Sequence, residues 1–289
     1  MTPAAHDRRA STRPGSTCVT IAISPESYAF LQQWIARATG IVIEVDKAYL
    51  LESRLAAILE KEHFPDFEML CTRLRLGIDR ALERRVIDAM TTNETTFFRD
   101  ILPFEAMQQH ILPNLIRDRP ANRKLMIWSA AASSGQEAYS LAMMLREMGL
   151  SHHEVEILGT DLSYEILEKA EAALYGPFEM NRGVPPLFLD RYFTHTNKQW
   201  RVNDDVRRMV RFEQFDLRQG GQAFGPYDIV LCRNVCIYFD IATKSQILSS
   251  IRQRMTTGGY LLLGGAESVS GGANFARKMV GQAAFYVAC

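Results

Sequence analysis

Between residues 23 and 90, apolar residues recur at the three- and four-residue spacing of amphipathic helices. The first helix is expected to begin after Ser24, a good N-cap residue, and to end at Gly40. Three further helices are expected to begin at acidic residues, namely Asp46, Asp66 and Asp79. The pattern therefore predicts a small all-α domain over residues 23–90.

After residue 100 the pattern changes to short, continuous apolar runs that alternate with helical ones. Strands are predicted at residues 125–131, 154–161, 227–234, 260–265 and 284–289. Helices are predicted at residues 104–116, 136–148, 164–174 and 243–255. The alternation predicts an α/β domain over residues 101–289, with a mostly parallel sheet and helices on both faces. A turn is expected at Gly258 and Gly259, and the last two strands could form an antiparallel edge.

One segment does not follow this alternation. Between residues 185 and 212 the runs RYFTHT, WRVND and MVRF are short and β-like, and polar turns separate them. They predict a small β-subdomain, inserted into the α/β domain at about residues 181–212.

Composition narrows the class of protein. Apolar residues make up 47% and charged residues 23% of the 289 residues, which is ordinary for a soluble globular protein with a buried core. The 33 basic and 33 acidic residues balance, so we expect no nucleic-acid partner and no attraction to anionic membranes. No apolar run is long enough to span a bilayer, so we expect no membrane insertion either.

Residues 1–22 are polar and lack the apolar stretch of a secretory signal, so we expect a disordered arm. The five cysteines are scattered and form no Cys-x-x-Cys pair, which argues against a disulfide framework and against a zinc site. Cys232 and Cys236 are expected to be small buried hydrophobes. These features favour a reducing, cytoplasmic environment.

Candidate ligand-binding residues lie where predicted strands end, because open α/β sheets bind ligands there. The first strand leads into SAAASSGQEAYS, in which Gly135 either lets the backbone approach a ligand or forms a mere tight turn. This loop lacks the GxGxxG pattern that cradles a pyrophosphate, which favours S-adenosylmethionine over NAD. Asp161 ends the second strand and either accepts hydrogen bonds from both ribose hydroxyls or caps a helix, for which Ser163 is better placed.

Three further positions suit the same ligand. Glu137 could serve the dipole of its helix or face the ammonium group of the ligand. Asp216 offers an acceptor for the adenine amino group and Leu217 an apolar surface for its ring, although Asp216 could also be a turn residue.

The strand at residues 227–234 ends in Arg233 and Asn234, and Tyr238 follows closely. A guanidinium at the end of a central strand could orient a carboxylate through two hydrogen bonds. The alternative is a salt bridge beside a turn asparagine.

The run TTNETTFFRD, at residues 91–100, joins the two predicted domains. A simple linker would be rich in glycine, serine or proline and would not need the pair Phe97 and Phe98. We expect this pair to be buried and the linker to be ordered. It would then hold three polar residues at the cleft, namely Asn93, Thr95 and Arg99.

Over residues 24–286 the chain resembles the chemotaxis receptor methyltransferases, because five sequence blocks occur in the order seen in that family. The blocks are TTNETTFFRD, WSAAASSGQEAYSLAM, the strand that ends at Asp161, CRNVCIYFD and GGYLLLGGAES. The resemblance implies a small all-α domain followed by a Rossmann-like methyltransferase domain with a β-subdomain insert. It also implies that S-adenosylmethionine is the cofactor and that glutamate side chains of chemotaxis receptors are methylated.

The resemblance also implies roles by position. It implies contacts with S-adenosylmethionine for nine residues: Asn93, Thr95, Arg99, Glu137, Asp161, Asp216, Leu217, Arg233 and Asn234. It places Tyr238 near the transferred methyl group, and our hypothesis is that Arg99, Arg233 and Tyr238 orient the acceptor. The methyl group on the sulfonium is already activated, so no metal is required. The acceptor carboxylate is ionised near neutral pH, so no general base is required either.

The chain departs from the family pattern at several positions. The first loop reads SSGQEAYS where the usual form is close to STGEEPYS, and Asp216 stands in place of a family asparagine. The segment RYFTHTNKQWRV lacks the glycines of members that grip a receptor's C-terminal peptide, so we expect no such tether. Ala57 and Glu60 dilute the basic charge around Arg54, where members face receptors.

The expected partner is the cytoplasmic helical bundle of methyl-accepting receptors, and the enzyme is expected to be a monomer. Two alternatives stay open: a methyltransferase for another protein or a small molecule, and a non-catalytic module that senses S-adenosylmethionine. The all-α domain offers a face for a partner helix, which opposes a small-molecule acceptor. Suitable residues at every cofactor and acceptor position oppose the sensing module.

Overall fold

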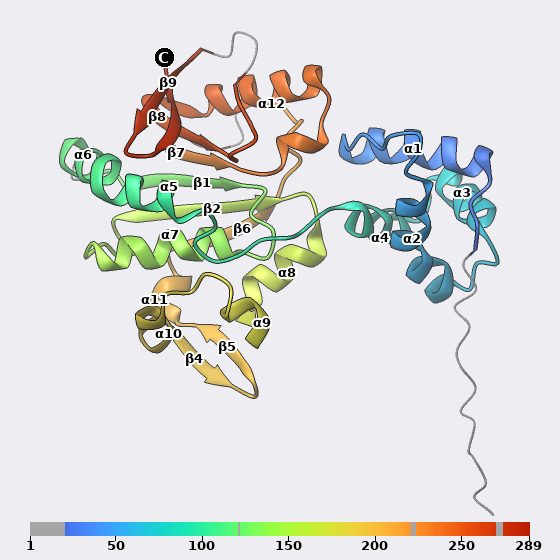
Figure 1. Ribbon diagram of the computed structural model, residues 1–289, viewed down its shortest axis with the longest axis horizontal. Helices are drawn as coiled ribbons and strands as arrows, with labels where there is room; N and C mark the ends of the chain where they lie inside the picture. Colours follow the sequence, from blue (N-terminus) through green and yellow to red (C-terminus); the bar gives the residue numbers. More distant parts are fainter. Residues whose placement is uncertain (1–20, 121, 221–223, 270–273) are drawn as a thin grey trace, which may run out of the picture.

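The computed structural model describes residues 21–120, 122–220, 224–269 and 274–289. Residues 1–20 of the expected N-terminal arm lie outside this range. Figure 1 shows a group of helices at one end of the molecule and a larger body built around a central sheet. An irregular stretch, residues 91–100, joins the two and is called the linker below.

The first body consists of four helices, as the hydrophobic pattern predicts: α1 (Pro25–Thr39), α2 (Ala48–Glu62), α3 (Phe67–Leu76) and α4 (Arg80–Met90). Ser24, Asp66 and Asp79 cap their helices by accepting a hydrogen bond from a first-turn backbone N–H. The expectation for Asp46 is wrong, because the N-cap of α2 is Lys47, which makes no side-chain capping bond. Buried apolar residues from all four helices form a core of their own.

The second body is built on a seven-stranded sheet with the strand order β6-β2-β1-β7-β8-β10-β9. The strands are β1 (Leu125–Ala130), β2 (Val155–Asp161), β6 (Val210–Gln214), β7 (Tyr227–Cys232), β8 (Met255–Leu263), β9 (Phe275–Val280) and β10 (Ala283–Ala288). The first five in this order are parallel, whereas β10 is antiparallel to both β8 and β9. The predicted α/β class with a mostly parallel sheet is therefore confirmed.

Helices cover both faces of this sheet (Figure 1). Successive strand residues point to opposite faces, so Ile127 of β1 joins the core that includes α7, and Trp128 joins the core that includes α12. The helices are α5 (Ile101–Ala106), a π-helical turn (Met107–Ile111), α6 (Leu112–Asp118), α7 (Gln136–Glu147), α8 (Tyr164–Ala172) and α12 (Ile241–Gln253). The helix predicted at 104–116 is thus one helical run, interrupted by a π turn just before Pro113, which has no N–H to donate.

The C-terminal strands differ from expectation in two ways. The pattern does not predict β9, because its segment FARKMV lacks apolar alternation and only Val280 is buried. The turn expected at Gly258 and Gly259 is wrong, since both residues lie within β8. A Cβ on Gly259 would lie 2.9 Å from the carbonyl oxygen of Thr256, so the backbone here passes too close to its neighbours for a side chain.

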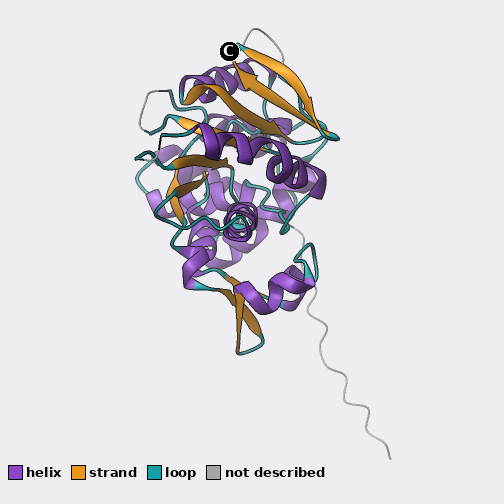
Figure 2. Cartoon of the chain, turned by 90° about the vertical axis from the view of Figure 1, so that its left-hand side faces the viewer, coloured by secondary structure: helices purple, strands orange, loops and turns teal. Residues whose placement is uncertain are grey.

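The inserted subdomain contains a three-stranded antiparallel sheet in the order β3-β5-β4. Its elements are β3 (Leu174–Tyr175), α9 (Pro177–Met180), α10 (Pro186–Tyr192), β4 (Phe193–Thr196), β5 (Gln199–Val202) and α11 (Asp204–Arg207). The hairpin of β4 and β5 projects away from the central sheet (Figure 2).

The third β-like run of this region, MVRF, does not belong to the insert. Residues Val210 to Phe212 lie in β6, which pairs in parallel with β2 at the edge of the main sheet. An edge strand with alternating half-buried and exposed residues has the same pattern as a hairpin strand, so periodicity alone could not assign it.

The insert packs directly against the linker. Phe97 is completely buried and makes edge-to-face contacts with Tyr175, at 4.9 Å between ring centroids, and with Phe193, at 5.5 Å. Gly183 lies so close that a Cβ on it would come within 1.9 Å of the carbonyl oxygen of Phe97. Its φ of +97° also disfavours any other residue. The insert therefore fixes the middle of the linker.

We expect Gly183→Ala to destabilise the protein much more than Gly149→Ala, as measured by urea unfolding. Both glycines have positive φ, but a Cβ at Gly149 would meet nothing within 4 Å. Gly149→Ala should therefore cost only the left-handed strain of about 1–2 kcal/mol. Gly183→Ala should cost a further ~1–3 kcal/mol, because its Cβ collides with backbone. Equal losses in the two variants would contradict the close packing of insert and linker.

Candidate active site

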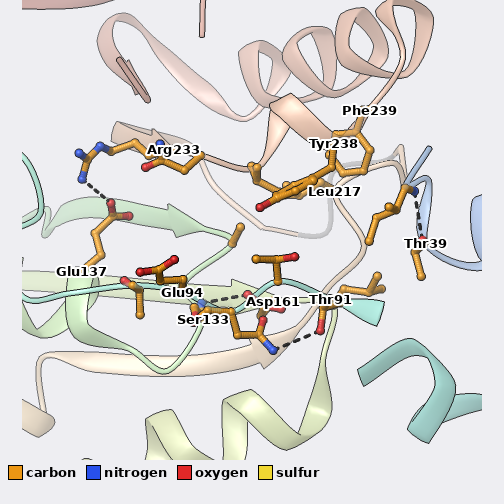
Figure 3. A pocket seen from close by; sticks show the side chains of 18 of the residues that line it. Thr39, Thr91, Glu94, Ser133, Glu137, Asp161, Leu217, Arg233, Tyr238 and Phe239 are labelled. Atoms are coloured by element: carbon orange, nitrogen blue, oxygen red, sulfur yellow. Dashed lines mark hydrogen bonds and ion pairs between the residues drawn. The ribbon is translucent and has the colours of Figure 1, made fainter. Parts of the chain in front are cut away.

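A pocket opens at the carboxyl ends of β1, β2 and β7, between the linker, the end of α1 and the loop that follows β6 (Figure 3). It encloses about 920 Å³ of space that no atom fills, its open mouth included. All ten residues singled out from the sequence line it: Asn93, Thr95, Arg99, Glu137, Asp161, Asp216, Leu217, Arg233, Asn234 and Tyr238.

Asp161 is held rigidly at the end of β2. Its carboxylate accepts a hydrogen bond from the backbone N–H of Ser133 at 2.9 Å and another from that of Ser163 at 3.1 Å. Ser133 reaches it because its backbone is left-handed, with a φ of +51°, an uncommon conformation for a residue other than glycine. Burial raises the pKa of Asp161, and the two backbone hydrogen bonds oppose this shift. Ser163 caps α8, so the capping role is not left to Asp161.

The linker forms one wall of the pocket. The hydroxyl of Ser133 donates to the backbone carbonyl of Asn93 at 2.8 Å, which fastens the linker to the loop after β1. Arg54 of α2 donates to the carbonyl of Met90 at 2.7 Å and to the hydroxyl of Thr92 at 2.9 Å. The guanidinium of Arg54 is therefore engaged at the start of the linker. Phe97 is buried, as predicted, while Phe98 is only partly buried.

Arg233 occupies the centre of a charged cluster at one end of the pocket (Figure 3). Its guanidinium donates to Glu137 at 3.0 Å, to Asp100 at 2.8 Å and to the backbone carbonyl of Arg99 at 2.9 Å. The hydroxyl of Ser129 donates to the other carboxylate oxygen of Glu137 at 2.7 Å. The side chain of Arg233 is only 3% exposed, so its charge is balanced inside the protein. We call this group the Arg233 cluster.

The alternative interpretation of Arg233 and Asn234 is a salt bridge beside a turn asparagine. It describes the ion pairs of Arg233 and the backbone of Asn234. Asn234 has a φ of +57°, and its backbone N–H donates to Glu267 at 2.8 Å. Both residues nevertheless line the pocket. Within the described residues, the buried Nε of Arg233 has no hydrogen-bond partner.

The opposite end of the pocket is apolar. Leu217, Tyr238 and Phe239 lie together there, and Thr39 of α1 closes the far side (Figure 3). Asp216 is at the edge of this group, and its carboxylate accepts three hydrogen bonds from the guanidinium of Arg218. An apolar surface beside a carboxylate matches the expectation for an adenine site.

Of the two interpretations of Gly135, the structure shows the tight turn: its backbone N–H donates to the carbonyl of Ala132 at 3.0 Å, and its φ is +88°. Gly135 does not line the pocket, and the space where its Cβ would be faces Phe212, Ala170 and Tyr139 at 3.0–3.2 Å. The glycine therefore permits close packing of α7 against the sheet and α8, and Ser133 of the same loop lines the pocket.

The pocket is also lined by eleven residues that the sequence patterns do not single out: Thr39, Ile41, Thr91, Thr92, Glu94, Ala131, Ser133, Leu162, Phe215, Val235 and Phe239. Most are direct neighbours of predicted residues, so proximity in the chain was a usable signal. Thr39 and Ile41 had no such signal, because they come from the helical domain and reach the pocket only through the packing of the two bodies.

The two cysteines beside this site are buried, as expected. Their sulfur atoms, in Cys232 and Cys236, lie 3.8 Å apart. The contact with Cys236, together with burial, raises the pKa of the Cys232 thiol well above its usual value. Both behave as small hydrophobic residues, in the core that includes α12.

Comparison with known proteins gives the family. The family model described as "CheR methyltransferase, SAM binding domain" matches residues 93–285, and the model described as "CheR methyltransferase, all-alpha domain" matches residues 26–91. The chain belongs to the CheR methyltransferase family. It is an S-adenosylmethionine-dependent methyltransferase, and the resemblance stated from the sequence is confirmed.

Several relatives match over most of their length. The chain is 37% identical to chemotaxis protein methyltransferase Cher2 of Pseudomonas putida, over 82% of this chain and 88% of that protein. It is 39% identical to chemotaxis protein methyltransferase 1 of Pseudomonas aeruginosa, over 84% of this chain and 90% of that protein. It is 37% identical to the chemotaxis protein methyltransferase of Vibrio parahaemolyticus, over 87% of this chain and 92% of that protein.

The residues of this CheR methyltransferase fit its cofactor. Asp161 is a buried carboxylate with lone pairs left for hydroxyl donors, and an apolar wall stands where a purine ring would lie. No helix among the described residues has both the length and the apolar character that crossing a membrane requires.

We expect Arg233→Met to lower the free energy of unfolding by about 3–5 kcal/mol, because it leaves the carboxylate of Glu137 buried without its partner. The matched control is Arg191→Met, which breaks an ion pair with Glu147 whose arginine is 58% exposed. That variant should lose less than about 1 kcal/mol. Urea unfolding followed by circular dichroism measures both, and similar losses would refute the structural role of the Arg233 cluster.

Proposed function

We propose that this methyltransferase esterifies glutamate side chains in the cytoplasmic helical bundle of chemotaxis receptors. The observation that carries the proposal is the meeting of ten predicted residues in one pocket at the carboxyl ends of the strands. The relatives at 37–39% identity are named chemotaxis protein methyltransferases, which supports receptors as the acceptors.

Polar residues around the pocket would hold S-adenosylmethionine. Asp161 would accept hydrogen bonds from the ribose hydroxyls, and Asp216 with Leu217 would receive the adenine. Glu137 would face the ammonium group, because its carboxylate oxygens can each accept more than the one hydrogen bond they have here. Asn93, Thr95 and Asn234 would complete the walls.

The two arginines of the site differ in a way that suggests different roles. Arg233 is neutralised by Glu137 and Asp100, so its main role would be to position the linker and α7. Arg99 has no carboxylate within ion-pair distance among the described residues, and it lines the mouth of the pocket. Arg99, together with Tyr238, would therefore orient the acceptor carboxylate.

The chemistry requires little from the protein beyond positioning. S-adenosylmethionine supplies a methyl group that its positively charged sulfur has already activated. A glutamate side chain has an ordinary pKa of about 4.3, so it is ionised near neutral pH and needs no general base. Arg99 and Tyr238 would hold this carboxylate in line, and closure by the linker and Thr39 would limit the access of water.

The proposal also covers the domain boundaries, the oligomeric state and the receptor-facing surface of the protein. We propose a division into an arm at residues 1–22, a helical domain at 23–90, the linker at 91–100 and the methyltransferase domain at 101–289. We further propose that the enzyme is a cytoplasmic monomer and that its insert holds no C-terminal receptor peptide. The engagement of Arg54 with the linker supports a weakly basic receptor-facing surface.

Transfer of a radiolabelled methyl group to purified receptor cytoplasmic fragments tests the function. The expected result is labelled receptor whose methanol is released by mild base, as glutamate methyl esters require. Label on other proteins but not on receptors would show that receptors are not the acceptor and would favour a methyltransferase for another protein. Binding of the cofactor without transfer to any acceptor would favour the sensing module instead.

In the same assay, Arg99→Gln should lower kcat roughly tenfold to a hundredfold, because the acceptor carboxylate is no longer oriented. The affinity for S-adenosylhomocysteine should fall less than kcat does, since Arg99 is one of nine residues implied in cofactor binding and the other eight remain. Arg211→Gln is the control, because Arg211 lies on β6 outside the pocket and pairs with Glu156. An unchanged kcat in Arg99→Gln would remove Arg99 from the proposed mechanism.

The affinity for S-adenosylhomocysteine should fall as the pH is lowered from about 8 to about 5. Burial raises the pKa of Asp161, so this carboxylate takes up a proton at a higher pH than an ordinary one and then loses acceptor capacity for the ribose. Asp161→Asn should bind more weakly at pH 8 and vary less with pH. Calorimetric titrations that give parallel pH profiles for both proteins would exclude Asp161 as the titrating group.

A further inference from the structure

Arg218 joins the two bodies of the protein beside the pocket. On one side its guanidinium binds Asp216, from Nε to Oδ1 at 3.0 Å and from the terminal nitrogen to Oδ2 at 2.6 Å. On the other side it donates to the carbonyl oxygens of Arg37 at 3.0 Å and Ala38 at 2.8 Å, in the last turn of α1. A single side chain thus contacts both a pocket residue and the helical domain.

The arrangement suits the chemistry of a helix end. The last carbonyl groups of a helix have no partner within the helix and carry the negative end of its dipole, so they attract a cation. A guanidinium has enough N–H donors in a fixed plane to bind these carbonyls and a carboxylate together. A lysine could supply the charge at Arg218 but not this geometry.

The contacts around Arg218 leave little room for movement. Gly40 follows α1 with a φ of +79°, and a Cβ there would lie 2.7 Å from Cδ of Arg218. Two residues after Gly40, the backbone N–H of Val42 donates to the carbonyl of Tyr238 at 3.1 Å. Thr39 and Ile41, which flank Gly40, line the pocket. The position of these two wall residues is therefore set by the same contacts that hold Asp216.

We propose that Arg218 is a positioning residue that couples cofactor binding to the docking of the helical domain. The inference rests on the proposed cofactor site, in which Asp216 receives the adenine. When the cofactor is bound, it lies between Asp216 and the wall of Thr39 and Ile41, and Arg218 holds the two at a fixed separation. Such coupling is reciprocal, so bound ligand also fixes the end of α1.

The test uses S-adenosylhomocysteine as the probe and the full chain with Arg218→Met. Calorimetry should show affinity weakened about tenfold, within the usual range for coupled sites. Hydrogen exchange followed by mass spectrometry should show that the ligand protects residues 36–42 in the unsubstituted protein, and that this protection is lost in Arg218→Met. A merely stabilising role for Arg218 would not remove protection that depends on the ligand.

The matched control is Arg123→Met. Arg123 forms an ion pair with Asp228, at 2.9 Å, at the end of the sheet away from the pocket. Their side chains are 36% and 9% exposed, against 23% and 15% for Arg218 and Asp216. This variant should lose stability but keep both the affinity and the protection of residues 36–42. Arg218→Lys should recover the charge without the geometry, and therefore only part of the affinity.

Affinity within twofold of the unsubstituted protein in Arg218→Met, or protection of residues 36–42 that persists in it, would overturn the proposal. If Arg218→Met does not fold, Arg218→Lys is judged by the same two criteria. The calorimetry and the hydrogen exchange involve no acceptor, so both can be interpreted even if the protein does not methylate receptors. The two proposals can therefore fail separately.

Discussion

The buried charge of Arg233 is the constraint on which the active site depends. A guanidinium that is almost completely removed from water must be balanced by carboxylates, and here Glu137 of α7 and Asp100 of the linker do so. The strand β7, the first helix after β1 and the linker are thereby tied together at one point. Because the linker also forms a pocket wall, the shape of the cofactor site follows from this charge balance.

Other contacts extend the same principle along the linker. Arg54 holds its start, Ser133 holds Asn93, and Phe97 inserts between rings of the inserted subdomain. The linker contains neither helix nor strand, yet its backbone groups and its buried ring are fixed by three separate parts of the protein. A segment held in this way can contribute to binding as reliably as a strand end does.

The pocket also shows where stability has been given up for function. Ser133 adopts a left-handed backbone, and Asp161 is buried as a carboxylate whose raised pKa reflects the loss of water. Both features cost stability. They cluster at the carboxyl ends of β1 and β2, which is where an α/β sheet places its ligand.

The sequence alone determined the fold class, the helices of the first body, the family and all ten predicted pocket residues, because strand ends and capping residues are local signals. Periodicity could not assign β6 to the main sheet or predict β9, since edge strands carry little apolar signal. Only the tertiary structure decided what each residue contacts. Among the described residues, it turned Gly135 toward the core, paired Arg233 but not Arg99 with carboxylates, and placed Thr39 in the pocket wall. These outcomes depend on packing between segments far apart in the chain, which no local pattern encodes.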